Sequence, residues 1–262
     1  MTKRSMTVNA EPRRDKGSYR HMLDLAASPK FESIINHILD GTGARLASPD
    51  NRHPKGRMKA ADWTEMILED YLKACPLPQL QTGMDRKWWM PYTGNRPTWD
   101  LLGHLVVNGE PGLLLVEAKA RVGEVGDQDS KSPAEPKNPR SVANDLSIRL
   151  RFAEASLALS DLGYGKFQLS TEHQYQLSNR LAYLNQLTSL GVPTVLVYLG
   201  WVNSPDWPTN EPLKDGRHWE KVVKTHFAKV GPWEFVSEKK THESGGSMQM
   251  VVRAVSPDVL ND

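Results

Sequence analysis

The chain has only one cysteine, Cys75, so it contains neither an internal disulfide framework nor a cysteine-based zinc site. Long apolar runs are also missing: the longest candidate, residues 192–202, is interrupted by proline and glycine and falls short of the roughly 18 residues that a membrane-spanning helix needs. The first residues are charged and lack the apolar stretch of a secretory signal. We therefore expect a cytoplasmic protein with no membrane partner.

An excess of one charge sign is absent as well, since 33 Lys and Arg residues face 31 Asp and Glu residues among 262. A hydrophobic content of 39% with 24% charged residues is typical of a folded soluble core and argues against both a disordered chain and a membrane protein. Basic residues do gather locally, in residues 1–20 and 45–59. These two clusters could face the phosphates of a nucleic acid, or form a solvated basic arm.

Apolar periodicity predicts helices over residues 31–39, 60–74, 141–159, 172–190 and near 219–229. Strands are predicted at 101–107, 113–118 and 192–201, with a closing hairpin of strands at 233–236 and 248–255. The Asn108-Gly109 pair between the first two strands indicates a β-hairpin. Stretches rich in Gly and Pro predict loops at 41–57, 122–140 and 203–216. This order predicts one α/β domain with a mixed sheet.

Two carboxylates and a lysine are predicted to meet at one end of this hairpin. Strand alternation puts Glu117 and Lys119 on the same face, and pairing across the turn brings Asp100 close to them. The Glu-x-Lys tripeptide recurs at residues 135–137 and 238–240, but only the first copy ends an apolar strand. Buried charges are tolerated when they are paired or bind a metal. The alternative is a solvent-facing salt bridge at a strand end.

This arrangement resembles the PD-(D/E)XK nuclease superfamily over residues 60–120 and, loosely, 172–201. The resemblance implies a restriction-endonuclease-like core, in which a mixed central sheet is flanked by helices, with N-terminal and mid-chain insertions. Residues 1–59 would be a basic N-terminal extension with a short helix, and residues 60–262 a nuclease-like α/β domain with an insert at 121–171. The chain departs from the motif name because Thr98 and Trp99 separate Pro97 from Asp100.

The resemblance also implies a role for each residue of the hairpin. Asp100, Glu117 and the backbone carbonyl of Ala118 would bind Mg²⁺, for which Mn²⁺ could substitute, because Mg²⁺ prefers oxygen ligands and retains several waters. Lys119 would orient or help to deprotonate the attacking water, with its pKa depressed by the neighbouring cation.

Two further elements carry candidate site residues. The family often has a glutamate on the helix before the hairpin, for which Glu65 and Glu69 are the candidates and Glu65 is the better match. On the predicted helix 172–190, Gln176 and Arg180 share one face and are candidate DNA contacts by the same resemblance. A solvated helix face is the alternative for this pair.

We therefore expect a Mg²⁺-dependent endo- or exodeoxyribonuclease that hydrolyses phosphodiester bonds of DNA. A non-catalytic module that binds nucleic acid or protein on a degenerate nuclease scaffold is the alternative, and an enzyme acting on small phosphorylated molecules is a third. A homodimer would suit cleavage of both strands. Trp88, Trp89 and Trp99 lie near the expected site in sequence and could stack on bases, although core packing is expected for at least two of them.

Overall fold

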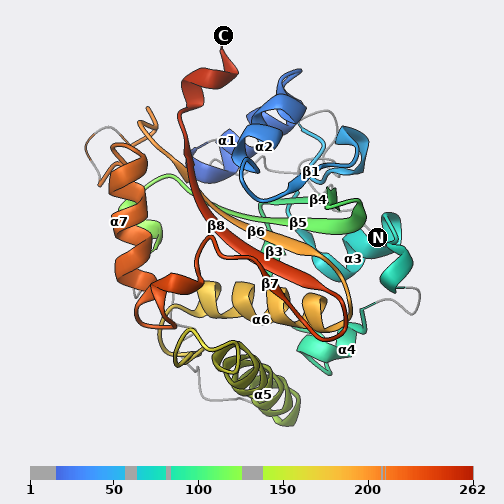
Figure 1. Ribbon diagram of the computed structural model, residues 1–262. Helices are drawn as coiled ribbons and strands as arrows, with labels where there is room; N and C mark the ends of the chain where they lie inside the picture. Colours follow the sequence, from blue (N-terminus) through green and yellow to red (C-terminus); the bar gives the residue numbers. More distant parts are fainter. Residues whose placement is uncertain are drawn as a thin grey trace, which may run out of the picture.

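A six-stranded mixed sheet with strand order β1-β4-β5-β6-β8-β7 forms the centre of the computed structural model, which describes residues 16–56, 64–80, 84–125, 138–207, 209 and 211–261 (Figure 1). β1, β4 and β5 are antiparallel neighbours, whereas β5, β6 and β8 run parallel. The strands are β1 (Ala44–Leu46), β4 (Leu101–Val107), β5 (Glu110–Lys119), β6 (Thr194–Trp201), β7 (Lys240–Thr241) and β8 (Ser247–Val255). The expected α/β class with a mixed sheet is confirmed.

The hairpin of β4 and β5 forms where the sequence predicts it. Its turn has only two residues, Asn108 with φ of 50° and Gly109 with φ of 94°, where a five-residue loop was expected. Two successive positive φ angles define the turn type whose twist matches that of paired strands, and glycine adopts them without strain. The turn therefore fixes the register of the hairpin from Val107 and Glu110 at its tip to Leu101 and Val116 at its open end.

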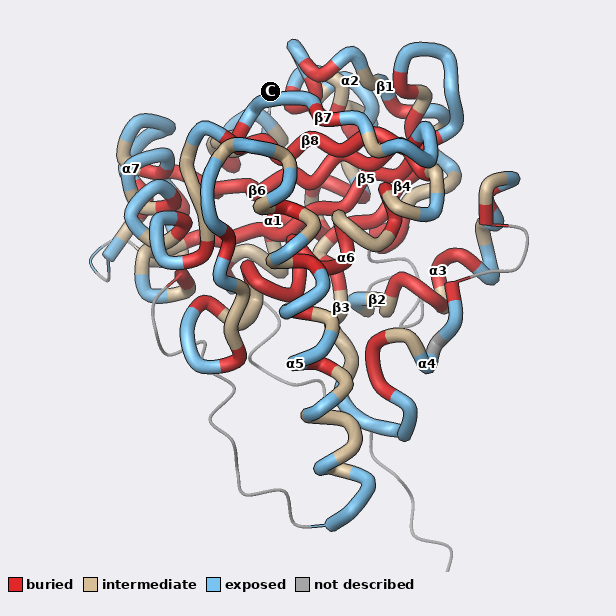
Figure 2. The backbone as a smooth tube through the Cα atoms, turned by 60° about the horizontal axis from the view of Figure 1, so that its bottom comes forward, coloured by how far each residue is buried: buried red, intermediate tan, exposed pale blue. Residues whose placement is uncertain are grey.

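Helices cover both faces of the sheet because side chains alternate along each strand (Figure 1). Leu114 and Val116 of β5 pack with α1 (Gly17–Ala27) and α2 (Phe31–Ile38), whereas Leu113 and Leu115 join the core that holds α6 (Tyr175–Ser189) and α7 (Gly216–Phe227). The long helix α5 (Pro139–Ser160) packs on the outer side of α6. Figure 2 shows that the strands are almost wholly buried, whereas α5 exposes much of its surface.

Two short elements precede the hairpin. α3 (Leu68–Ala74) begins eight residues later than the expected helix at 60–74, because Met66–Ile67 form a short strand, β2, that pairs with β3 (Thr98–Trp99). Tertiary pairing therefore overrides the helical pattern in this segment, and residues 57–63 lie outside the described part of the chain. α4 (Arg86–Trp89) follows α3 after a short 3₁₀ turn at Pro78–Leu80.

The sequence expectations fail at three other places. The expected strand at 233–236 is a 3₁₀ turn, Trp233–Phe235, and the short antiparallel partner of β8 is β7. The expected loop at 41–57 contains β1 and a 3₁₀ turn, Pro49–Asn51, and α1 was not predicted at all. The 3₁₀ turns and the three-residue strand β1 carry too little periodicity to be recognised without their partners, whereas α1, with 11 residues, is long enough and was overlooked.

The basic clusters are only partly described. Arg52 donates to the Ala26 carbonyl at 2.8 and 3.0 Å and stacks 4.6 Å from the Phe31 ring centre, so it stabilises the fold and does not face solvent phosphate. Most of residues 1–20 and the boundary between residues 59 and 60 fall outside the described residues. Trp89 and Trp99 are fully buried, as expected for core residues. None of the described helices is long and apolar enough to cross a membrane.

Candidate active site

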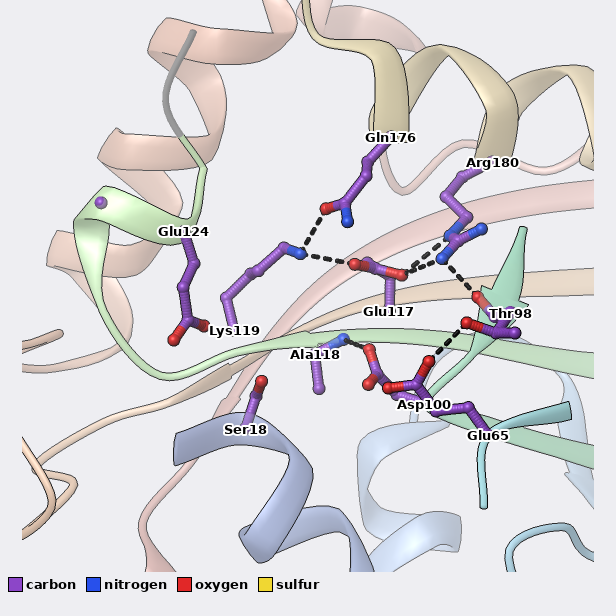
Figure 3. A pocket seen from close by; sticks show the side chains of 11 residues that line it. Ser18, Glu65, Thr98, Asp100, Glu117, Ala118, Lys119, Glu124, Gln176 and Arg180 are labelled. Carbon is purple, nitrogen blue, oxygen red and sulfur yellow. Dashed lines mark hydrogen bonds and ion pairs between the residues drawn. The ribbon is translucent and has the colours of Figure 1, made fainter. Parts of the chain in front are cut away.

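A cavity of about 350 Å³ opens where the hairpin ends, at the carboxyl end of β5 (Figure 3). Most of its wall comes from β5, from the segment that joins β3 to β4, and from α6. It is lined by Ser18, Glu65, Thr98, Asp100, Glu117, Ala118, Lys119, Gly123, Glu124, Gln176 and Arg180. The structure therefore brings together every residue expected for the site except Glu69.

Two strand registers converge on Asp100. Continuing the antiparallel register of β4 and β5 by one residue puts Asp100 across from Glu117, and continuing that of β2 and β3 puts Glu65 across from Asp100. The Ala118 backbone N–H donates to Asp100 Oδ2 at 2.7 Å, and the Thr98 hydroxyl donates to Glu65. In Figure 3 the carboxylates of Asp100 and Glu65 point toward one another.

The charge of Asp100 is poorly compensated. Burial raises the pKa of Asp100 well above its ordinary value, and repulsion from Glu117 and then Glu65 raises it further. The ammonium of Lys119 and the Ala118 N–H oppose this shift without cancelling it. A cation placed between these oxygen atoms would remove the repulsion.

Glu117 has the opposite environment, because a cation binds each of its oxygen atoms. Lys119 Nζ donates to Oε1 at 2.5 Å, and Arg180 donates to Oε2 through Nε at 2.8 Å and Nη2 at 2.5 Å. Glu117 is only 2% exposed. Burial alone would raise the pKa of Glu117, but the charges of Arg180 and Lys119 outweigh burial and hold it below its ordinary value.

Lys119 is fixed from two sides. Besides Glu117, its Nζ donates to Gln176 Oε1 at 2.5 Å. Burial disfavours the ammonium, but the charge of Glu117 outweighs burial and raises the pKa of Lys119 above its ordinary value. In these surroundings Lys119 is a firmly charged donor, whereas a depressed pKa was expected beside a bound cation.

Arg180 belongs to the interior of the site and not to a solvated helix face. It is 4% exposed, stacks 4.2 Å from the Trp99 ring centre and donates to the Thr98 carbonyl at 2.6 Å. Nη1 donates to Asn179 Oδ1 at 2.9 Å, so each of the three guanidinium nitrogens has a partner within the protein. Gln176, one turn earlier on α6, is half-buried. It lines the cavity and accepts the hydrogen bond from Lys119 Nζ.

The choice between the two upstream glutamates is clear in the structure. Glu69 lies in α3, is 2% exposed and accepts a hydrogen bond from the Tyr183 hydroxyl at 3.3 Å, away from the cavity. Burial raises the pKa of Glu69. Glu65 lines the cavity, although it lies in an extended segment next to β2 and not on a helix as expected.

Four lining residues were missed from the sequence: Ser18, Thr98, Gly123 and Glu124. Ser18 comes from the first turn of α1, about eighty residues before the hairpin, and no local pattern connects it to the site. Glu124 follows β5 closely, accepts the Ala120 N–H at 2.9 Å and lies 3.6 Å from the Arg121 guanidinium. Its position five residues after Lys119 was the one available signal.

The donor set suits a hard cation only in part. Among the described residues no three His, Cys, Asp or Glu side chains form a ready-made metal site. The carboxylates of Asp100 and Glu65 face each other and supply the oxygen ligands that Mg²⁺ prefers. Because Mg²⁺ retains waters, two carboxylates are enough. Glu117, expected as a ligand, has one acceptor site left, on Oε1, because Lys119 and Arg180 occupy the other three.

Comparison with known proteins does not identify the chain, since no protein family, no curated protein sequence and no solved structure matches it. What the protein does must be inferred from the cavity and the residues that line it.

Proposed function

We propose that the protein is a Mg²⁺-dependent nuclease that hydrolyses phosphodiester bonds of DNA and is built on a PD-(D/E)XK-like core. The observation that carries the proposal is the meeting of the Asp100 and Glu65 carboxylates, with the Lys119 ammonium fixed nearby, in one open cavity. Two carboxylates that repel each other could share a metal ion, and the ammonium of Lys119 lies beside them. This combination suits metal-assisted hydrolysis of a phosphate ester.

The order of elements supports the same core. α3 precedes the β4–β5 hairpin, and α6 leads into β6, which pairs parallel to β5. The described residues contain no further strand between the hairpin and α6. On the far side of the hairpin, β1 instead extends the sheet.

Each residue has a part in this proposal. Asp100 and Glu65 would hold the metal, with the Ala118 carbonyl implied only by the resemblance. When bound, the metal polarises the phosphate and lowers the pKa of a water. Lys119 contributes a fixed positive charge where negative charge develops on the phosphate, and Gln176 and Glu117 hold its Nζ in place. Because its pKa is raised, Lys119 acts as a donor and not as a base.

A non-catalytic binding module on the same scaffold is the second candidate, and one observation favours it. Lys119 and Arg180 each form an ion pair with one oxygen of Glu117, so this carboxylate serves to neutralise the two buried cations. In that case the polar cluster would stabilise the fold, and the facing carboxylates would not bind a cation tightly.

Metal binding and cleavage, measured together, test the proposal. Titration calorimetry of the chelator-treated protein with Mg²⁺ and Mn²⁺ should detect one site, and Asp100→Asn should remove it while the exposed Asp161→Asn leaves it unchanged. The Asn amide oxygen can still accept the Ala118 N–H, so the fold should survive.

Linear, circular and single-stranded DNA should then be cleaved only with the metal, and Lys119→Met should abolish cleavage without abolishing metal binding. Metal binding without cleavage of any of these DNAs would contradict a nonspecific nuclease. Absence of both would favour the binding module.

A further inference from the structure

The outer face of α5 carries a row of apolar side chains that no described part of the chain covers. Val142, Leu146, Leu150 and Leu157 are 38%, 61%, 50% and 69% exposed. They are four of the seven large hydrophobic residues exposed among the described residues. Single exposed leucines are ordinary on protein surfaces, but a contiguous apolar row on one element marks an interaction surface.

The row follows the helix closely. At about 100° per residue, positions 142, 146, 150, 153 and 157 fall within roughly 80° of the circumference, along about 22 Å of axis. The opposite side of α5 holds Ile148, Phe152, Ala155 and Leu159, which are buried. α5 is therefore apolar on two faces, of which only one packs against the described part of the chain. Figure 2 shows that much of this helix is exposed.

We propose that two copies of this chain associate through the exposed row of α5, packed antiparallel. A two-fold axis between residues 147 and 148 sets Leu146 opposite Leu150 of the second copy and Val142 opposite Ala153. Each of these contacts occurs twice by symmetry. The small Ala153 opposite Val142, and the paired leucines between them, would let the two helices pack closely, as in antiparallel coiled coils.

The charges beside the row are self-complementary in that same register. In two helices related by this axis, each side of the apolar row lies next to the same side of the row in the second copy. On one side Asp145 then meets Arg149 of the second copy, and on the other side Arg140 meets Glu154. Within one chain Arg149 Nε already lies 2.8 Å from Asp145 Oδ2, so the dimer would form an alternating four-charge cluster. The two charge pairs have their midpoint at residue 147, and the two apolar contacts have theirs between 147 and 148 or at 148, so all four agree within one residue, about 1.5 Å along the helix axis.

The exposed row of α5 lies outside the cavity, so the dimer does not depend on the proposed nuclease function. The mass of the protein in solution tests for this dimer. Analytical ultracentrifugation of the full chain between about 1 and 200 µM should give a mass that rises from 29.4 kDa toward twice that value. Leu146→Lys should weaken association by at least about a hundredfold, because each dimer loses two buried leucines and gains two charges.

The matched control is Leu190→Lys, a leucine of 40% exposure outside the row, which should leave the dimer intact. At about 1 µM, where the chain is expected to be a monomer, both variants should retain the parental urea midpoint, since both side chains are exposed. A mass of 29.4 kDa at every concentration, or equal weakening by both variants, would overturn the proposal.

Disulfide trapping tests the orientation in a background where Cys75, the one native cysteine, is replaced by serine. Val142→Cys combined with Ala153→Cys should give a covalent dimer on mild oxidation. Val142→Cys alone should not, because residue 142 lies far from its own copy in an antiparallel pair. Efficient trapping of the single variant would show a parallel pair and refute this arrangement.

Discussion

Replacing Arg180 with methionine should destabilise the fold by about 3–5 kcal/mol, because it removes one partner of a buried ion pair. Methionine keeps most of the buried volume but leaves Glu117 Oε2 without its two donors and the Thr98 carbonyl without its 2.6 Å donor. Lys119 then compensates Glu117 alone. The loss is a large part of the roughly 5–15 kcal/mol that stabilises a typical domain.

Urea unfolding followed by tryptophan fluorescence measures this loss. With a slope near 3 kcal/mol/M, the midpoint should fall by about 1–2 M. Arg45→Met is the control, because Arg45 is exposed on the edge strand β1, and its removal should change stability by no more than about 0.5 kcal/mol. The slope itself should stay constant if only the native pair is lost.

A double-mutant cycle with Glu117→Gln isolates the pair from the other contacts of Arg180. The combined variant should be more stable than the sum of the single effects predicts by about 2 kcal/mol, since each single change already breaks the pair. Additive effects within about 0.5 kcal/mol would refute the pairing. They would instead indicate that Glu117 faces the cavity in solution and is free to bind metal.

The remaining predictions concern the carboxylates and the hairpin. Because the pKa of Asp100 is raised in the folded state, the protein should lose stability as pH rises from about 4 through that raised pKa, and Asp100→Asn should flatten this part of a urea-stability profile. Glu65→Gln should weaken Mg²⁺ binding about tenfold or more in calorimetry, whereas Glu69→Gln should leave it unchanged, and equal effects would contradict the assignment of Glu65. Gly112→Ala should lower stability by about 1–3 kcal/mol in urea unfolding, because a Cβ there would lie 2.4 Å from a backbone carbonyl oxygen before β6; Gly216→Ala, with its nearest contact at 3.6 Å, should not.

The part of the site that lies on the hairpin could be predicted from sequence because strand geometry is local. Alternation along β5 fixes Glu117 and Lys119 on one face, and a two-residue turn fixes the register that brings Asp100 to them. The apolar residues on both sides of Glu117 also show that its charge must be compensated inside the protein. The chemistry of the hairpin therefore follows from a short stretch of sequence.

The partners of that hairpin could not be predicted with the same precision. Glu65 reaches Asp100 because β2 pairs with β3, and a two-residue strand leaves no periodic signal. Arg180 was recognised as a neighbour of Gln176 on one helix face, but the direction of that face depends on how α6 crosses the sheet. The alternative of a solvated face was therefore wrong, for a reason that only tertiary packing supplies.

The balance of charge connects metal binding to phosphate binding in this cavity. Arg180 and Lys119 are both committed to Glu117, so Glu65 and Asp100 add negative charge that no nearby cation fully offsets. When Asp100 and Glu65 are both ionised, these carboxylates and Glu117 outnumber the two cations by one charge, and the cavity should then repel a phosphodiester. A divalent cation between Asp100 and Glu65 would reverse the sign of the local charge and leave Lys119 positioned beside an attracted phosphate. In the proposed nuclease Arg180 would contribute without touching DNA, because by sharing Glu117 it would leave the other two carboxylates, and not Glu117, to bind the cation.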